Sequence, residues 1–347
     1  MPRILVLGGG PAGLEAALCL ADQGQEVMLV EKNEELGGNP RFYNCKAEDE
    51  CRRCGACMVA ERVYRAKQHP LIQILTGSRL ISARLEGRSF IIRCQRDGFL
   101  VPPGATPAGE MEARVEGIIL ATGFEPFDPA LRTEMGYLKN ERVVTAGEME
   151  IILQHADEDR WEELLGVMPR IAIVRCFGSR EQSRGVAYCS RVCCLYSERL
   201  GQILIDKIPG ASVDIFFMDS QRYHPVYGAG DQGRIRYIRG MPARIFQDHA
   251  ANLILRYEDT GRSQTSQNSY DWVVLCPAML PAREGSGVAE MLGVDRDERG
   301  FVVGANGLTN KRGVFAAGCC TGPKTILESL GSGQTAAGQL LKHLTSA

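Results

Sequence analysis

Short apolar runs alternate with helix-like patterns along the first part of this chain. Arg3–Leu7 is an apolar run of the kind that forms a buried parallel strand. The apolar residues within 14–21 recur at helical spacing, Gly24 ends that helix, and residues 27–30 form a second apolar run. This strand–helix–strand order predicts an α/β fold with a parallel sheet.

The same kind of pattern returns further along the chain. Residues 115–126 are strand-like, and residues 312–341 read as a strand, a loop and a final helix. Between these segments, apolar runs at 170–174, 213–217 and 270–276 predict the strands of a second α/β region.

A glycine-rich loop joins the first strand to its helix. Residues 8–13 read GGGPAG, a GxGxxG pattern whose glycines permit a tight turn and a close approach of the backbone to a pyrophosphate. The N-terminus of the following helix offers N–H groups to phosphate oxygens, and Glu31 can accept hydrogen bonds from a ribose. A lone GxGxxG is a weak signal, but the order strand, loop, helix, strand and acid predicts a dinucleotide site.

Three further features resemble FAD-binding flavoproteins of the glutathione and thioredoxin reductase type. They are the pair Gly37-Gly38, the strand that ends in Ala121-Thr122-Gly123, and the C-terminal strand, loop and helix. The resemblance covers nearly the whole chain and implies FAD as the cofactor. It also implies that the nucleotide-binding domain is split, because its last strand and helix return at the C-terminus.

This resemblance implies an architecture and a set of binding residues. It predicts an α/β flavoprotein with two dinucleotide-binding domains. A split FAD-binding Rossmann-type domain (1–125 plus 280–347, with the cysteine-rich segment 45–57) holds an inserted second α/β domain (126–279). The implied FAD-binding residues are Gly8, Gly10, Pro11, Ala12, Gly13, Glu31, Lys32, Gly38, Asn39, Thr122, Gly123, Gly318, Lys324, Thr325 and Ile326. The family's Gly-Asp pair near the C-terminus, whose acid contacts the ribityl chain, is replaced here by Gly318-Cys319.

Composition narrows the class of protein. Of the 347 residues, 44% are hydrophobic and 24% are charged, which is typical of a soluble globular chain. The net charge of −2 argues against a nucleic-acid binder, and no apolar run reaches the roughly 18 residues that span a bilayer. The N-terminus has no signal-peptide layout, so we expect a cytoplasmic protein. The polar stretch at 259–269 is expected to be a loop.

Thirteen cysteines are many for a cytosolic chain, where clustered thiols indicate metal or redox chemistry rather than disulfides. They form two groups and one pair: Cys45, Cys51, Cys54 and Cys57; Cys176, Cys189, Cys193 and Cys194; and Cys319 with Cys320. Cys19, Cys94 and Cys276 stand alone, and we interpret them as small buried hydrophobic residues.

The second cysteine group stands where a two-dinucleotide flavoenzyme would carry its second glycine loop. After the strand at 170–174 the chain reads Arg175-Cys176-Phe177-Gly178, and bulky Phe177 would obstruct a phosphate, so we predict no NAD(P)H binding here. The C-x12-C-x3-C-C spacing favours a four-iron cluster. Zinc, or structural or reactive thiols, are the alternatives.

Two stretches closely resemble the flavoprotein A-subunit of heterodisulfide reductases: AYCSRVCCLYSER at 187–199 and GCCTGPKTILESLGSGQTAA at 318–337. The resemblance implies a [4Fe–4S] cluster close to the FAD, with Cys176, Cys189, Cys193 and Cys194 as ligands. Methanogen-type subunits are longer and carry ferredoxin-like domains, whereas no ferredoxin CxxCxxCxxxCP run is present here. The chain is therefore most similar to the short A-subunit of the sulfur-oxidising heterodisulfide-reductase-like complex. It is also similar to the flavin subunit of quinone-interacting oxidoreductases.

The first cysteine group has ligand-like spacing, C-x5-C-x2-C-x2-C from Cys45 to Cys57. Flanking Arg52 and Arg53 would favour the thiolate forms. Three interpretations stay open: a second iron–sulfur cluster, a zinc site, or a lid over the flavin with redox-active or structural thiols.

The motifs predict an electron-transfer oxidoreductase, and the resemblance implies that it serves within a larger complex of sulfur metabolism. Electrons would pass between FAD and the cluster, and then to iron–sulfur and disulfide-reductase-type partner subunits; a homodimer is also expected from the resemblance. One alternative is a self-contained NAD(P)H-dependent disulfide or sulfur reductase with Cys54 and Cys57, or Cys319 and Cys320, as redox thiols. The other is a scaffold protein with structural zinc.

Overall fold

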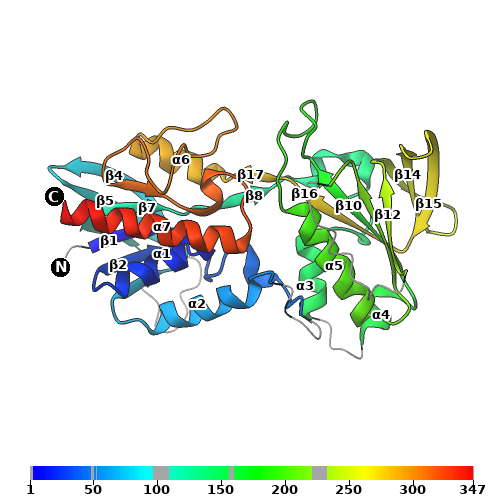
Figure 1. Cartoon of the computed structure of the whole chain (residues 1–347), viewed down its shortest axis with the longest axis horizontal. Coiled ribbons are helices and arrows are strands. Elements are labelled where there is room, and N and C mark those ends of the chain that lie inside the picture. The colour runs from blue at the N-terminus through cyan, green and yellow to red at the C-terminus, as the bar shows by residue number, and fades with distance from the viewer. Residues whose placement is uncertain are drawn as a thin grey trace. The chain divides into compact units, whose positions relative to one another are not determined.

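The structure, a computed structural model, describes residues 3–47, 51, 53–96, 109–155, 160–220 and 233–346. The chain divides into two compact units (Figure 1). The first unit comprises Met1–Arg41, Cys54–Glu125 and Leu280–Ala347, and the second comprises Phe42–Arg53 and Pro126–Met279.

A five-stranded parallel sheet forms the centre of the first unit, in the order β18-β7-β1-β2-β3. Its strands are β1 (Arg3–Leu7), β2 (Glu26–Val30), β3 (Ile72–Leu75), β7 (Gly117–Leu120) and β18 (Val314–Ala316). Leu5 pairs with Met28 on one side and with Ile118 on the other. Because both faces of this sheet are covered, its strands read as continuous apolar runs.

Helices cover one face of this sheet, and a small antiparallel sheet covers the other (Figure 1). The helix layer consists of α1 (Pro11–Ala21), α2 (Ala56–Gln68) and α7 (Ile326–Thr345), and the opposite layer of β4 (Ser78–Glu86), β5 (Ser89–Arg96), β6 (Gly109–Val115) and α6 (Arg283–Leu292). Ile4 and Val6 pack into the helix layer, whereas Leu5 and Leu7 pack into the opposite one. This alternation is what a pleated strand with two buried faces requires.

The second unit repeats this layering with different elements. Its parallel sheet has the order β12-β11-β10-β16-β9. The strands are β9 (Val143–Thr145), β10 (Arg170–Phe177), β11 (Ser212–Phe217), β12 (Ile235–Arg239) and β16 (Trp272–Pro277). Helices α3 (Ala146–His155), α4 (Trp161–Leu165) and α5 (Cys193–Lys207) pack on one face. Two parallel sheets confirm the predicted α/β class.

An antiparallel meander of β13 (Pro242–Gln247), β14 (Leu253–Asp259) and β15 (Gln264–Tyr270) accompanies the second sheet. Phe216 of β11 makes edge-to-face ring contacts with Tyr257 and Tyr270 of this meander. The loop expected at 259–269 is therefore wrong for most of its length. The polar residues of β15 pair with β14 from Asp259↔Gln264 to Leu253↔Tyr270, and this pairing overrides their low strand propensity.

Two short strands complete the fold, β8 (Phe124–Pro126) and β17 (Met279–Pro281), which pair with each other. Among the described residues, no helix combines the length and the apolar character needed to cross a bilayer.

Candidate functional site

The glycine loop of the first unit has a shape that side chains would destroy. Gly8 has φ +106°, and a Cβ there would lie 2.3 Å from the carbonyl oxygen of Ala121. A Cβ at Gly13 would lie 1.8 Å from the carbonyl oxygen of Gly8. A Cβ at Gly10, in contrast, would meet no atom within 4 Å. The loop is thus closed toward the protein and open at Gly10, as a phosphate-binding turn requires.

Glu31 stands beside this loop with its carboxylate inside the protein. It is 5% exposed, and its Oε2 accepts a hydrogen bond of 2.6 Å from the backbone N–H of Gly9. Its Oε1 accepts from the backbone N–H of Asn33 at 2.9 Å and from Asn33 Nδ2 at 2.7 Å. Oε2 retains a second lone pair, so the carboxylate can also accept from a ribose hydroxyl. Lys32 lies nearer the surface and pairs with Glu284 at 3.3 Å.

Three other predicted FAD residues of the first unit, Gly38, Thr122 and Gly318, lie near the same loop. A Cβ at Gly38 would lie 3.2 Å from Gly10 Cα, and a Cβ at Gly318 would lie 2.6 Å from Ala12 Cβ. Thr122 follows β7, where its hydroxyl faces Gly285 of α6. Chain segments far apart in sequence therefore meet around the start of α1.

The start of α7 is built by a capping box. The hydroxyl of Thr325 accepts from the backbone N–H of Glu328, and the Glu328 carboxylate accepts from the backbone N–H of Thr325. The Cys319 thiol donates to the carbonyl oxygen of Lys324 at 3.6 Å, and burial raises the pKa of Cys319. Cys319 is therefore a neutral thiol that donates to the turn before α7, and it does not offer the carboxylate acceptor that the sequence resemblance implies at this position.

In the second unit, Cys176 departs from regular strand geometry. Its φ is +58°, and the register of β10 against β16 shifts between Val174 and Phe177. In regular alternation Cys176 would point away from Ile171 and Ile173, yet it packs with them in the helix-side core. This bulge directs Cys176 toward the start of α5, where Cys193 and Cys194 lie buried in the same core.

The thiols of the second group interact with one another. Cys193 donates a hydrogen bond to Cys176, and this bond lowers the pKa of Cys176 despite its burial; the Arg180 cation acts in the same direction. The same bond raises the pKa of Cys193 to about 12. Cys189 lies close enough for its charge to affect Cys176. The structure therefore packs Cys176, Cys193 and Cys194 together in one core, and Cys189 interacts with Cys176.

The loop at 178–192 holds Cys189 through its two neighbours. The hydroxyls of Ser179 and Ser190 lie 2.9 Å apart, and Ser190 Oγ also accepts from the backbone N–H of Met279 at 2.9 Å. Tyr188 Oη donates to the carbonyl oxygen of Met279, also at 2.9 Å. Cys189 is thus anchored on both sides and only half-buried.

Phe177 fills the place where a phosphate-binding turn would follow β10. It is 2% exposed and packs edge-to-face on Phe127, with ring centres 5.8 Å apart. The next helix, α5, begins only at Cys193. Absence of NAD(P)H binding stays a prediction.

The first cysteine group is divided between the two units. Cys45 and Cys51 belong to the segment that groups with the second unit, whereas Cys54 and Cys57 belong to the first. A Cβ at Gly55 would lie 3.0 Å from Ile326 Cγ2, so Cys54 and α2 start beside the start of α7. Arg52 lies outside the described residues, and the second cluster or zinc site stays a prediction.

The described part of the chain contains no group of three or more His, Cys, Asp or Glu side chains arranged to hold a metal ion. A four-iron cluster makes a different demand, since each thiolate binds a different iron instead of converging on one ion. The second cysteine group fits a four-iron cluster chemically, because it supplies four thiols. One of them, Cys176, has a lowered pKa.

The sequence did not identify two residues that lie near the second cysteine group. Cys276, expected to be an isolated core residue, packs in the same core as Cys193 and Cys194, and their charges act on it. Arg175 is 1% exposed beside Cys176. The sequence alone could not place Cys276 near this group, because the placement depends on the pairing of β16 with β10.

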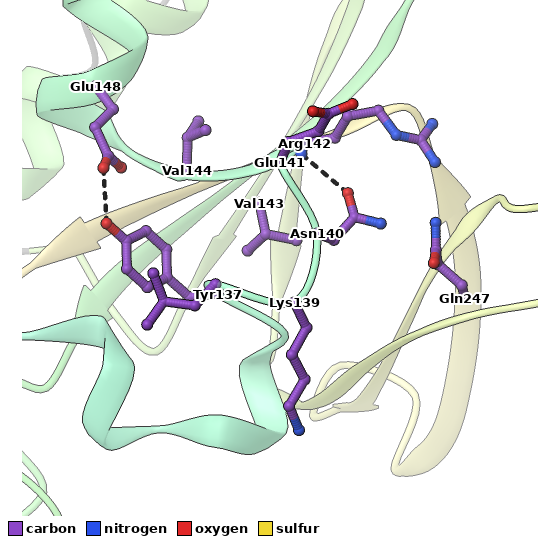
Figure 2. A pocket seen from close by; sticks show the side chains of 10 residues that line it. Tyr137, Lys139, Asn140, Glu141, Arg142, Val143, Val144, Glu148 and Gln247 are labelled. Carbon is purple, nitrogen blue, oxygen red and sulfur yellow. Dashed lines mark hydrogen bonds between the residues drawn. The ribbon is translucent and has the colours of Figure 1, made fainter.

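A separate pocket of about 610 Å³ lies in the second unit (Figure 2). Tyr137 Oη donates to Glu148 at 2.7 Å on one side of it, and Asn140 accepts from the backbone N–H of Arg142 at 2.9 Å on the other. Its lining contains none of the predicted site residues.

With this geometry established, comparison with known proteins defines the class. Residues 2–173 match the pyridine nucleotide-disulphide oxidoreductase family. Thioredoxin reductase from Lactococcus lactis, in its FR conformation, has a TM-score of 0.65 at 18% identity, with 100% of both chains covered. That from T. acidophilum has a TM-score of 0.64 at 18% identity, with 100% of this chain and 99% of the other covered. The protein is an oxidoreductase with a thioredoxin-reductase-like fold, and the match to this family over residues 2–173 implies FAD.

Over nearly its whole length the chain is homologous to the A-subunit of heterodisulfide reductases, which confirms that resemblance. It is 29% identical to the second of two iron-sulfur A-subunits of the CoB–CoM heterodisulfide reductase of Methanopyrus kandleri, with 99% of this chain and 64% of the relative covered. It is 26% identical to the A-subunit of the ferredoxin/F420H2-dependent CoB-CoM heterodisulfide reductase of Methanosarcina acetivorans, with 99% of this chain and 53% of the relative covered. The chain thus spans between about half and two thirds of these relatives.

Proposed function

We propose that this protein is the FAD- and [4Fe–4S]-containing electron-transfer subunit of a heterodisulfide-reductase-like complex in sulfur metabolism. The observation that carries the proposal is that Cys176, at the end of β10, shares one core with Cys193 and Cys194 at the start of α5, while Cys189, in the loop between them, is near enough to interact with Cys176. The name of the Methanopyrus kandleri relative, which calls it an iron-sulfur subunit, supports a cluster at this place. Partner subunits of the complex would exchange electrons with it and would carry the disulfide chemistry.

The glycine loop and Glu31 would hold the FAD. The open backbone at Gly10 would receive the pyrophosphate and Glu31 the ribose, and Thr325 and Ile326 at the start of α7 would face the flavin. When bound, the flavin supplies the exchange of two electrons on one side and single electrons on the other. We assign residues 1–125 plus 280–347 to this function, and 126–279 to the cluster.

The four cysteines would hold the cluster as thiolates. The lowered pKa of Cys176 favours its deprotonation. Cys193 keeps its proton through the hydrogen bond to Cys176 and would release it on binding iron, and the position of Cys193 and Cys194 at the N-terminus of α5 would stabilise their thiolates. The hydrogen-bonded loop at 178–192 would keep Cys189 in place while the cluster is inserted.

Metal and flavin analysis tests this proposal. The protein is purified without oxygen, and iron, sulfide, zinc and FAD are quantified per chain for the wild type and for Cys193→Ala. We expect about four irons per FAD in the wild type and their loss in the variant. Cys94→Ala is the matched control, because Cys94 is a buried cysteine of the first unit. About eight irons, halved by Cys193→Ala, would mean that the first cysteine group also holds a cluster.

Absence of iron after anaerobic reconstitution overturns the proposal. The favoured alternative would then be a self-contained NAD(P)H-dependent reductase, since the family match and the similarity to thioredoxin reductases support it. Rapid bleaching of the flavin by NADH or NADPH would identify that activity. The buried Phe177 and the late start of α5 count against it.

A further inference from the structure

Arg175 is a charged residue in an unusual place. Its side chain is 1% exposed, and it precedes Cys176 on β10. The alternation of β10 directs it to the helix side of the sheet, the same side that carries Cys176, Cys193 and Cys194. A guanidinium so far from water needs partners to be tolerated.

These partners connect Arg175 to the helix that carries two of the cysteines. Arg175 Nε donates to Ser197 Oγ at 2.6 Å, and Ser197 Oγ donates to the carbonyl oxygen of Cys194 at 3.0 Å. Arg175 Nη2 donates to Glu198 Oε1 at 3.0 Å. The guanidinium carbon also lies 5.7 Å from the ring centre of Tyr237. Arg175 thus bridges the end of β10 to the first turns of α5.

Stability alone is a weak reason for such a pair. A buried ion pair contributes little compared with apolar side chains of similar volume, because both charges lose their hydration. What the pair does supply is a fixed positive charge beside Cys176 and a fixed negative charge at Glu198, in the first turns of α5. In an interior with a low dielectric constant, a fixed charge acts strongly on any nearby change of charge.

We propose that Arg175 is a positioning residue that sets the reduction potential of the cluster held by Cys176, Cys189, Cys193 and Cys194, with Glu198 acting in the opposite direction. The inference rests on the proposed function. Reduction adds one electron to the cluster. The guanidinium stabilises the added negative charge, and the Glu198 carboxylate opposes it.

The test is a potentiometric titration of the purified holoprotein, followed by the electron paramagnetic resonance signal of the reduced cluster. Arg175→Gln should shift the midpoint to more negative values, and Glu198→Gln to more positive values. Each shift should change the redox equilibrium by about tenfold, the size expected for a unit charge at close range in the interior. The double variant should return toward the wild type, and Arg175→Lys, which keeps the charge, should remain near it.

Arg236→Gln is the matched control. Arg236 pairs with Asp214, which hydrogen-bonds to Tyr270 of the meander, so this variant removes a charge on the other side of the sheet. Its potential should equal that of the wild type. A purely structural role for Arg175 would shift the potential in the same direction when either partner is changed.

The outcomes separate the two proposals. If the wild-type protein contains no iron, the proposed function is wrong. If it contains iron, but the potentials of Arg175→Gln and Glu198→Gln are unchanged or shift in the same direction, only the role of Arg175 is overturned. If Arg175→Gln fails to retain iron, Glu198→Gln decides alone. An unchanged or more negative potential in that variant contradicts the inference.

Discussion

Lys46 and Glu150 form an ion pair inside the second unit, with Lys46 Nζ 2.5 Å from Glu150 Oε1. The side chain of Glu150 is fully buried, and that of Lys46 is 3% exposed. Glu150 also accepts from the backbone and side chain of Asn44, and from Tyr196 Oη at 3.1 Å. Because Tyr196 belongs to α5, this network attaches the segment around Cys45 to the helix that begins with Cys193.

Breaking this pair should destabilise the second unit strongly. Glu150→Ala leaves the Lys46 ammonium buried without its carboxylate, which costs on the order of 3–5 kcal/mol of unfolding free energy. Thermal and urea unfolding of the purified protein measure this cost. The half-exposed pair of Asp297 and Arg299 is the control, since Arg299→Ala removes this ion pair but leaves the backbone hydrogen bonds of Asp297 in place, and should cost only about 1 kcal/mol or less. Equal losses in both variants would contradict this account of Glu150.

Two glycines of the loop allow an effect on protein stability to be separated from an effect on FAD binding. Gly13→Ala should destabilise the protein even without flavin, because its Cβ would meet the carbonyl oxygen of Gly8. Gly10→Ala should leave the melting temperature of the flavin-free protein unchanged, since its Cβ meets no protein atom. It should nevertheless weaken FAD binding by about tenfold or more if the pyrophosphate approaches there.

Fluorescence titration with FAD and thermal melts of the flavin-free protein measure these two effects. Gly331→Ala, which also adds a Cβ in open space but on α7, is the control and should bind FAD like the wild type. Normal FAD affinity in Gly10→Ala would remove this loop from the binding site.

The exposed thiols of the first cysteine group should react with alkylating reagents well before the buried ones. Cys45, Cys51 and Cys57 are exposed. Burial raises the pKa of Cys19 and of Cys94 to about 11, so both stay protonated and unreactive at pH 8 and gain reactivity only as the pH approaches that value. Mass spectrometry after a brief anaerobic pulse of iodoacetamide reads out each thiol.

Repeating the pulse after reconstitution with iron and sulfide, or with zinc, tests the three interpretations of this group. Protection of Cys45, Cys51, Cys54 and Cys57 together indicates a shared metal site. Continued labelling of all four, while the second group is protected, leaves them as redox-active or structural thiols.

Ser190 should matter for retention of the cluster. Ser190→Ala removes the acceptor of the buried Met279 N–H and the contact with the Ser179 hydroxyl, at a cost of roughly 1–3 kcal/mol. We expect a lower melting temperature and faster loss of iron to a chelator. Ser286→Ala, whose hydroxyl bonds within α6 in the first unit, should leave iron loss unchanged. Unaltered iron retention in Ser190→Ala would mean that the loop at 178–192 does not hold Cys189 for binding.

Short-range patterns were sufficient for much of this fold. The order of apolar run, GGGPAG loop, helix and acid between Arg3 and Glu31 acts over a few residues, so its physical meaning can be read without the rest of the chain. The meander strand β15 shows the limit. Its Ser, Thr, Asn and Gln residues favour a loop by composition, and only pairing with β14 makes them a strand.

The cysteines show even more clearly which features the sequence predicts and which depend on the tertiary structure. Spacing alone was enough to group Cys176 with Cys193 and Cys194, because one strand, one loop and one helix connect them. Spacing also grouped Cys45 with Cys57, but the fold assigns these two residues to different units, since the Lys46–Glu150 pair attaches the first of them elsewhere. Cys276 joins Cys193 only because β16 pairs with β10, and Arg175 is buried only because α5 supplies Ser197 and Glu198. Contacts of this kind depend on which distant segments pack together, and no local pattern of residues encodes that choice.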